Sequence, residues 1–271
     1  MSGVRLASVA VENAVADSPV LADAPEGFWG AFPPDPRAIR AGRSVRDGYA
    51  RGWGLQFNNL RARVIDDPLY RDALALAGGR SVMGEANRLN LYLIIRYFLA
   101  PYAPGAHIVE FGAYRGGNAM FMAHVVKTLY PGMRIFALDT FAGMPATDRS
   151  VDAHGQGDFA DASLEELQAL ARSRGLDNLE FVKGLFEDSA PDLLPSIGRV
   201  ALAHIDCDIY SAVAFAYQVV RPFMVPGGYM VFDDATTSSC IGATEAVESL
   251  VIRRDGLHSE QIYPQFVFRA P

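Results

Sequence analysis

The chain has 271 residues, half of them hydrophobic, with 24 basic and 31 acidic residues and a net charge of −7. This length and apolar content allow one large domain with a substantial core. The acidic balance gives no support to nucleic-acid or anionic-membrane binding and favours a small-molecule or glycan partner. Two cysteines are too few for a disulfide framework, so we expect a reduced, cytoplasmic setting.

Residues 1–84 differ in composition from the rest and are predicted to form an N-terminal arm with lid helices. They include the proline-rich segment Phe32–Arg37 and the arginine- and glycine-rich segment Arg40–Gly54. A helix is expected near Phe57–Ala77. The aromatic side chains of the arm could close over a bound ligand or support a homo-oligomer. Residues 85–271 are predicted to form the main domain.

In residues 85–271 short apolar runs alternate with helix-length segments, which is typical of repeated βα units and a mainly parallel sheet. The predicted strands end near Phe111, Asp139, Gly184, Asp206 and Asp233. The last fifteen residues indicate two short strands about Pro264, a C-terminal antiparallel hairpin. We therefore expect an α/β fold with a doubly wound, mainly parallel, seven-stranded sheet.

A glycine-rich turn follows the first predicted strand, with Glu110 at the strand end and Gly112, Gly116 and Gly117 after it. Glycines let a ligand approach backbone amides, and an acidic group here suits a cationic amino group better than a pyrophosphate. The spacing does not match the dinucleotide pattern G-x-G-x-x-G. A tight turn that only packs a helix onto a strand is the simpler alternative.

The next two strand ends add groups that suit the other parts of one ligand. Asp139 ends the second strand, where an acidic residue can hold ribose hydroxyls. Gly184 and Phe186 follow the third strand, where backbone and apolar groups could flank an adenine edge. Groups for an amine, a ribose and a base at successive strand ends describe a site for S-adenosylmethionine.

Carboxylates close the two strands that follow, with Asp206 after one and Asp233 and Asp234 after the other. The carboxyl ends of such strands open onto one crevice, and three carboxylates meeting there suit a hard cation such as Mg²⁺. Strand alternation places His204 on the same face as Asp206. Aspartates in this position also cap the next helix, which is the alternative without a metal.

From about Ser81 to the C-terminus the chain carries seven short motifs in order. They are SVMG, EFGAYRGG, DTFAGMP, KGLFED, HIDCDIY, PGGYMVFDD and CIGATEAV. In these motifs the chain resembles the TylF family of macrocin and mycinamicin sugar O-methyltransferases. The resemblance implies a Rossmann-like class I methyltransferase fold, Mg²⁺ dependence and methylation of a hydroxyl, typically on a deoxysugar of a natural product.

The resemblance also implies roles for individual residues. Asp206, Asp233 and Asp234 would bind the metal, an arrangement similar to that of catechol O-methyltransferases, although Asp234 stands where that family has an asparagine. Asp206 would be the general base, with His204 and Asp208 as alternatives. The residues implied in donor binding are Met83, Glu110, Gly112, Tyr114, Arg115, Asp139, Thr140, Gly184, Phe186 and Asp206.

Three functions remain open from the sequence. The first is a Mg²⁺-dependent sugar O-methyltransferase acting on a glycosylated natural product or a glycan. The second is a phenolic or catechol O-methyltransferase with the same metal chemistry, and the third is a catalytically silent donor-binding scaffold. The N-terminal arm matches the family least, so the acceptor is not identified. The loop from Ala146 to Ala162 is either a lid near the metal or an ordinary exposed loop.

Overall fold

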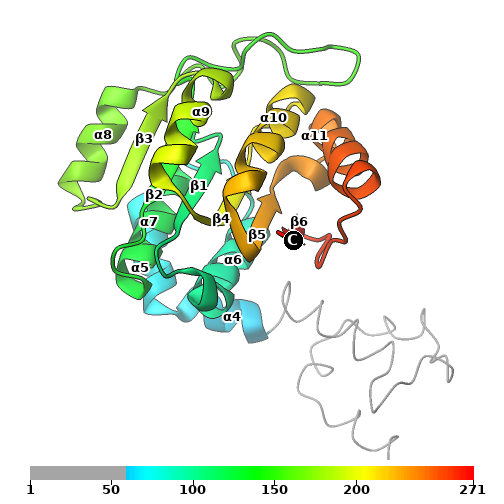
Figure 1. Ribbon diagram of the computed structural model, residues 1–271. Helices are drawn as coiled ribbons and strands as arrows, with labels where there is room; N and C mark the ends of the chain where they lie inside the picture. Colours follow the sequence, from blue (N-terminus) through cyan, green and yellow to red (C-terminus); the bar gives the residue numbers. More distant parts are fainter. Residues whose placement is uncertain (1–58) are drawn as a thin grey trace, which may run out of the picture. The chain divides into compact units, whose positions relative to one another are not determined.

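The computed structural model describes residues 59–271 of the chain (Figure 1). The chain divides into two units, Met1–Asp67 and Pro68–Pro271. The first contributes one described helix, α4 (Asn59–Asp66), and the second holds the sheet. The arm segments up to Phe57 lie outside the described residues, as does the self-association predicted through them. The domain boundary predicted at residue 84 stays a proposal.

Two helices occupy the segment near Phe57–Ala77, where the sequence predicted one. Helix α4 ends at Asp66, and α5 (Pro68–Ala77) begins at a proline. Proline fits the first turn of a helix, where its missing amide has no intrahelical acceptor, but it interrupts a helix interior. Pro68 therefore divides the segment.

Among the described residues, no helix combines the length and the apolar character that a bilayer crossing requires.

Six strands form one sheet in the order β3-β2-β1-β4-β5-β6 (Figure 1). They are β1 (His107–Phe111), β2 (Ile135–Asp139), β3 (Leu179–Lys183), β4 (Val200–Ile205), β5 (Met224–Phe232) and β6 (Phe266–Arg269). The first five are parallel, and β6 is antiparallel to β5. This confirms the predicted doubly wound, mainly parallel α/β sheet. The strand order reverses between β1 and β4, the point at which such sheets bind ligands.

Within the described residues the sheet has six strands, where the sequence predicted seven. The hairpin about Pro264 is present, but its first arm makes only a single bridge, between Gln261 and Val267. Pro264 cannot donate a ladder hydrogen bond, and the Ser259 hydroxyl accepts one from the Gln261 amide at 3.3 Å. These two features end the pairing before a seventh strand forms.

Helices cover both faces of the sheet (Figure 1). The helices beyond α5 are α6 (Glu85–Leu93), η3 (Ile94–Phe98), η4 (Ala100–Tyr102), α7 (Gly117–Leu129), α8 (Leu164–Ser173), α9 (Phe186–Ile197), α10 (Tyr210–Val220), η5 (Arg221–Phe223), η6 (Asp234–Thr236), α11 (Ile241–Ala246) and η7 (Val247–Arg254). Helix α10 packs between α9 and α11, and α5 packs on α7. Side chains of β1 alternate between the faces: Val109 and Phe111 join the apolar core with α9 to α11, whereas Glu110 bonds to Asn118 of α7.

The central strands are apolar because both of their faces are covered. Val109, Phe111, Ile205 and Phe232 are each at most 1% exposed. Burying each such side chain contributes about 1.5–3 kcal/mol. At the start of α8 the Ser163 hydroxyl accepts from the Glu166 amide at 3.4 Å and so caps the helix. The packed sheet holds the strand ends in fixed positions.

Candidate functional site

A cavity of about 480 Å³ opens at the carboxyl ends of β1, β2, β4 and β5. Nine of the predicted site residues line it, namely Met83, Gly112, Tyr114, Asp139, Thr140, Phe186, Asp206, Asp233 and Asp234. Four others do not, namely Glu110, Arg115, Gly184 and His204. The loop between β2 and α8 adds further lining through Met144, His154 and Phe159.

Gly112 brings the end of β1 against the end of β4. Its φ is +97°, and a Cβ there would lie 1.7 Å from the carbonyl oxygen of Asp206. The Asp206 amide donates to the Phe111 carbonyl at 2.9 Å, which holds the two chains at this spacing. Only glycine fits this approach, so backbone packing by itself accounts for a glycine at this position of the predicted turn.

Asp139 connects the loops that follow β1 and β2. One carboxylate oxygen accepts from the Tyr114 amide at 2.7 Å and the other from the Phe141 amide at 2.8 Å. Tyr114 and Phe141 both have positive φ, as do Phe159 and Asp208, and all four belong to segments that line the cavity. Strained backbone concentrates at functional sites, where surrounding contacts hold it in place.

His204 and Glu110 lie beneath the cavity and are fully buried. They are neighbours in the register of β1 and β4, and the His204 Nδ1 lies 3.2 Å from the Glu110 Oε1. The Asn118 amide donates to that oxygen at 2.5 Å, and the His204 Nε2 lies 3.6 Å from the Asp233 Oδ1. Burial opposes the charge of the imidazole, but Asp233 and Glu110 outweigh it and raise the pKa of His204 to about 9.

Asp233 is held by several donors at the floor of the site. Its Oδ1 accepts from the Asn87 amide at 3.1 Å and from the Gln265 amide, besides facing His204. Burial opposes ionisation, but the hydrogen bond and charge of His204 prevail and hold the pKa of Asp233 below its usual range. Asp233 is therefore a fixed carboxylate at neutral pH.

Asp206, Asp233 and Asp234 each place a carboxylate oxygen within 4.8 Å of the others. Burial and the charges of Asp233 and Asp234 raise the pKa of Asp206 well above its usual value. Burial and the charges of Asp208 and Asp233 raise the pKa of Asp234 to about 8. A divalent cation would relieve this crowding, and an all-oxygen donor set is the one that Mg²⁺ prefers. The residues present therefore fit a magnesium ion.

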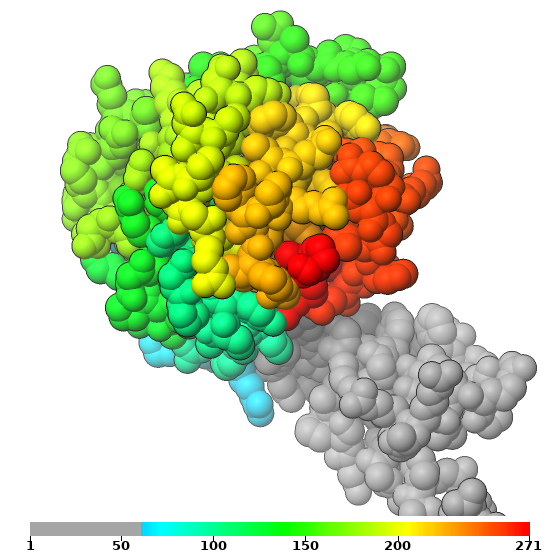
Figure 2. Space-filling view, in the orientation of Figure 1, coloured from blue at the N-terminus to red at the C-terminus, as the bar shows by residue number. Residues whose placement is uncertain are grey.

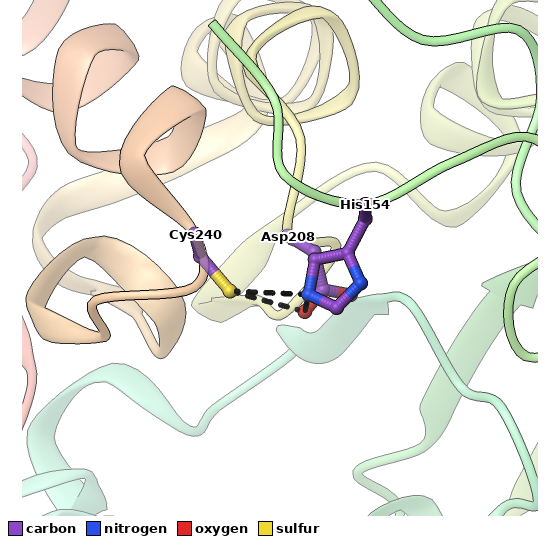
Figure 3. Close-up of side chains that lie close together, drawn as sticks. All are labelled: His154, Asp208 and Cys240. Atoms are coloured by element: carbon purple, nitrogen blue, oxygen red, sulfur yellow. Dashed lines mark hydrogen bonds and ion pairs between the residues drawn. The ribbon is translucent and has the colours of Figure 1, made fainter. Parts of the chain in front are cut away.

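Three side chains gather beside this carboxylate group, from segments distant in the sequence (Figure 3). His154 comes from the loop between β2 and α8, Asp208 follows β4, and Cys240 precedes α11. The Asp208 amide donates to Asp234 at 2.9 Å, so the two clusters are in contact. Burial, with the charge of Asp234, raises the pKa of the Cys240 thiol.

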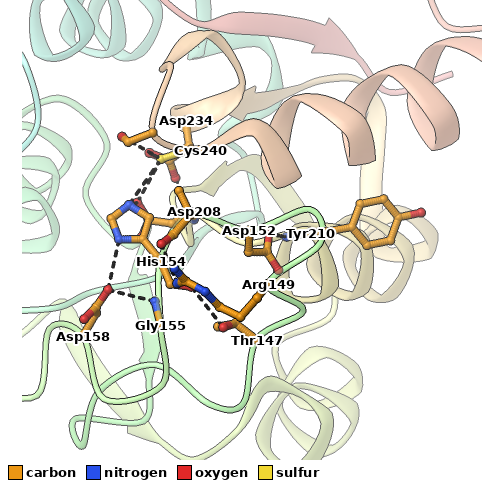
Figure 4. Close-up of polar contacts among 12 residues, drawn as sticks. Thr147, Arg149, Asp152, His154, Gly155, Asp158, Asp208, Tyr210, Asp234 and Cys240 are labelled. Atoms are coloured by element: carbon orange, nitrogen blue, oxygen red, sulfur yellow. Dashed lines mark hydrogen bonds and ion pairs between the residues drawn. The ribbon is translucent and has the colours of Figure 1, made fainter.

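Residues 144–162, here called the crossing loop, run over the strand ends (Figures 1 and 2). In the space-filling view the green atoms of this loop form the upper rim, next to the yellow atoms of α10. Asp152, 5% exposed, accepts from the Tyr210 amide at 2.8 Å at the start of α10. Gly242 leaves room for this carboxylate, because a Cβ there would lie 1.9 Å from the Asp152 Oδ1. Figure 4 shows Asp152 beside Tyr210.

Several of these partners are absent from the sequence predictions. Asn87, Asn118, Asp152 and Gln265 each satisfy a buried charge or helix end, and no motif assigns them that role. Cys240, counted in the sequence only as one of two cysteines, places its Sγ 3.4 Å from the Asp208 Oδ1. One signal was available, since Asn118 directly follows the glycine turn and is the second residue of α7.

A doubly wound parallel sheet with a cavity at its reversal point and acidic strand ends is the architecture of class I methyltransferases. Solved structures agree with this fold. The O-methyltransferase NovP superposes with a TM-score of 0.62 at 20% identity, covering 82% of this chain and 98% of NovP. The calicheamicin methyltransferase CalS11 superposes with a TM-score of 0.54 at 21% identity, covering 78% of this chain and 96% of CalS11.

The family model of the macrocin O-methyltransferases (TylF) matches residues 59–252, and the chain belongs to this family of S-adenosylmethionine-dependent methyltransferases. The 8-demethyl-8-(2,3-dimethoxy-alpha-L-rhamnosyl)-tetracenomycin-C 4'-O-methyltransferase of Streptomyces olivaceus is 31% identical over 161 residues, 56% of this chain and 60% of that protein. The mycinamicin III 3''-O-methyltransferase of Micromonospora griseorubida is 24% identical, over 67% of this chain and 84% of that protein.

Proposed function

We propose that this chain is a Mg²⁺-dependent O-methyltransferase that moves a methyl group from S-adenosylmethionine to a sugar hydroxyl of a glycosylated natural product or a glycan. The observation that carries the proposal is the meeting of three carboxylates in the cavity that Gly112 and Asp139 also line. The rhamnosyl group in the name of the Streptomyces olivaceus relative supports a sugar acceptor.

The donor is proposed to bind along the ends of β1, β2 and β3. Met83, Gly112, Tyr114, Thr140 and Phe186 would contact it, and the Asp139 carboxylate would accept from the ribose hydroxyls through lone pairs that its two amide donors leave free. All of these residues except Met83, which precedes α6, lie at or just after the ends of β1, β2 and β3.

Three predicted donor residues would act through lining residues. The Arg115 guanidinium lies 5.0 Å from the centre of the Tyr114 ring, and the Gly184 amide donates to the Asp139 carbonyl at 3.0 Å. Glu110 is one position from Phe111 and two from Gly112, and its bond to Asn118 ties the start of α7 to β1. We assign these residues to positioning the turn and the Asp139 loop.

Asp206, Asp233 and Asp234 would hold the magnesium ion. When bound, the ion supplies a positive charge that lowers the pKa of an acceptor hydroxyl and fixes its orientation. Asp206 is the proposed general base: it accepts the hydroxyl proton at a carboxylate oxygen as the acceptor oxygen takes the methyl group from the sulfonium.

His204 is proposed to be a positioning residue, because it is fully buried and does not line the cavity. Its imidazolium would hold Asp233 in the ionised state that a metal ligand needs. Asp208 lines the cavity and is the alternative proton acceptor.

The test is transfer of a labelled methyl group from S-adenosylmethionine to a panel of rhamnosylated natural products and catechols, each with Mg²⁺ and with a chelator. We expect metal-dependent labelling of a sugar hydroxyl. Labelling of catechols alone would support the phenolic alternative, and donor binding without any transfer would support the silent scaffold. Labelling that persists unchanged in chelator would contradict the metal role of the three aspartates.

A further inference from the structure

Three ligand atoms of different chemistry converge beside the carboxylate group (Figure 3). The Cys240 Sγ lies 3.4 Å from the Asp208 Oδ1 and 3.8 Å from the His154 Nε2. The His154 Nε2 lies 3.8 Å from the Asp208 Oδ1. The three atoms form a nearly equilateral triangle, although the residues belong to three segments spread over 86 positions of the chain.

This triangle has the size of one face of a tetrahedral zinc site. Zinc lies about 2.3 Å from thiolate sulfur and about 2.0–2.2 Å from imidazole nitrogen or carboxylate oxygen, so tetrahedral ligands are about 3.3–3.6 Å apart. The separations here are 3.4, 3.8 and 3.8 Å. Shifts of a few tenths of an ångström would suffice to bind a metal, while a solvent molecule or a fourth side chain completes the shell.

The donor set differs in kind from that of the neighbouring carboxylates. Sulfur, nitrogen and oxygen together suit Zn²⁺ and similar borderline cations, whereas Mg²⁺ takes oxygen ligands almost exclusively. Asp234 lies between the two groups: one of its oxygens is 3.8 Å from the Cys240 Sγ, and the other accepts from the Asp208 amide. Its negative charge adds to the attraction for a cation.

A second carboxylate orients the histidine (Figure 4). The His154 Nδ1 lies 3.3 Å from the Asp158 Oδ2, and the Gly155 amide donates to the same oxygen at 2.9 Å. With Nδ1 donating to Asp158, Nε2 keeps its lone pair and turns it toward Cys240 and Asp208. Metal-binding histidines characteristically have such a carboxylate behind them, and Asp158 occupies this position behind His154.

We propose that His154, Asp208 and Cys240 bind a divalent cation of the Zn²⁺ class, and that this ion fastens the crossing loop over the cavity. The Cys240 thiol loses its proton to solvent as the sulfur–metal bond forms. The loop is already attached at Asp152, and the ion supplies a second attachment two residues further on. The site shares its cavity and Asp208 with the proposed methyl transfer, but binding of this ion does not require that transfer to occur.

The binding test uses the full-length chain after treatment with chelator, titrated with Co²⁺ as a spectroscopic substitute for zinc and with Zn²⁺ in competition. We expect one equivalent of Co²⁺ to give a tetrahedral spectrum with a thiolate-to-metal band, which Zn²⁺ abolishes. Cys240→Ser removes the band, and His154→Gln weakens binding at least about tenfold, a loss of about 1.4 kcal/mol. The exposed His258→Gln is the control and binds normally.

The structural consequence is measured by trypsin cleavage after Arg149, an exposed residue of the crossing loop. Zn²⁺ at ten times its Kd should slow this cut about tenfold in the native chain, because binding multiplies the closed population by that factor. Zn²⁺ should not slow the cut in His154→Gln. Because His154 lies on a surface loop, this substitution leaves the sheet intact and remains a usable test even if Cys240→Ser folds poorly. His258→Gln keeps the protection.

Three results would overturn the inference. One is a native chain that gives no thiolate band with Co²⁺. Another is a band that survives in Cys240→Ser. The third is protection of Arg149 by Mg²⁺ alone to the same degree, which would assign the effect to the oxygen-only site. None of these outcomes depends on methyl transfer, so failure here leaves the proposed enzyme activity standing.

Discussion

The buried charge of His204 should make the free energy of unfolding depend on pH. Its imidazole is fully buried between Glu110 and Asp233, and its pKa is raised from 6.5 to about 9. Since each pKa unit corresponds to about 1.4 kcal/mol, the charged state contributes about 3 kcal/mol of stability. The folded pKa exceeds the unfolded one, so this contribution is complete below pH 6.5 and is lost as the pH rises through about 9.

The assay measures the free energy of unfolding in urea between pH 5.5 and 10, with a chelator present to keep the protein free of metal. It compares the native chain, His204→Gln and the exposed-site control His258→Gln. The variant lacks the ionisable group and leaves Glu110 and Asp233 without a counter-charge, so it should be least stable relative to the native chain at low pH. The difference should shrink by about 3 kcal/mol across the range. The control should follow the native curve. A difference that stays constant with pH would show that His204 is neutral in the folded protein and refute the charge assignment.

Three further predictions follow from close contacts and charge. A positive φ costs an alanine about 1–2 kcal/mol. Gly112→Ala should lower the free energy of unfolding by more than this, because its Cβ would lie 1.7 Å from the Asp206 carbonyl oxygen, whereas Gly132→Ala, at the same φ of +97° but in open space, should show the φ cost alone. Thermal unfolding compares the two variants, and equal losses would contradict the packing argument. Gly242→Ala, in α11, should displace Asp152 and remove a bond worth about 1.5–3 kcal/mol, which tryptic cleavage after Arg149 would report as a faster cut. Gly155→Ala, in the crossing loop, should leave the rate unchanged, because a Cβ there would lie 3.5 Å from its nearest neighbour, the Arg149 side chain. Mg²⁺ at ten times its Kd should raise the free energy of unfolding of the native chain by about 1.4 kcal/mol. Asp206→Asn should lose this increase, and the exposed Asp192→Asn should keep it. Equal increases in all three proteins would mean that the ion binds elsewhere.

Much of the fold was predictable from local pattern. Alternating apolar runs and helix-length segments identify the parallel sheet, because a strand covered on both faces must be apolar throughout. The meeting of Asp206 with Asp233 and Asp234 was also predictable, since β4 and β5 are consecutive, parallel and adjacent. Their carboxyl ends must then lie at one edge of the sheet.

Contacts between distant segments were not predictable in this way. The Glu110–His204 pair depends on β1 lying beside β4, which follows from the reversal of strand order rather than from any motif. Gln265 reaches Asp233 only because β6 returns antiparallel beside β5. His154, in a loop without periodicity, meets Cys240 through tertiary packing alone. A one-dimensional pattern contains no signal for such meetings.

Three aspartates at the ends of β4 and β5 are proposed to support metal-dependent methyl transfer. The most direct measurement is the rate of labelled methyl transfer to a rhamnosylated acceptor against Mg²⁺ concentration, for the native chain, Asp206→Asn and the exposed Asp192→Asn. We expect saturable Mg²⁺ dependence in the native chain and in Asp192→Asn. In Asp206→Asn we expect the rate to fall at least about a hundredfold, the scale of one general base. Transfer by Asp206→Asn at the native rate, or by the native chain in chelator, would contradict this proposal.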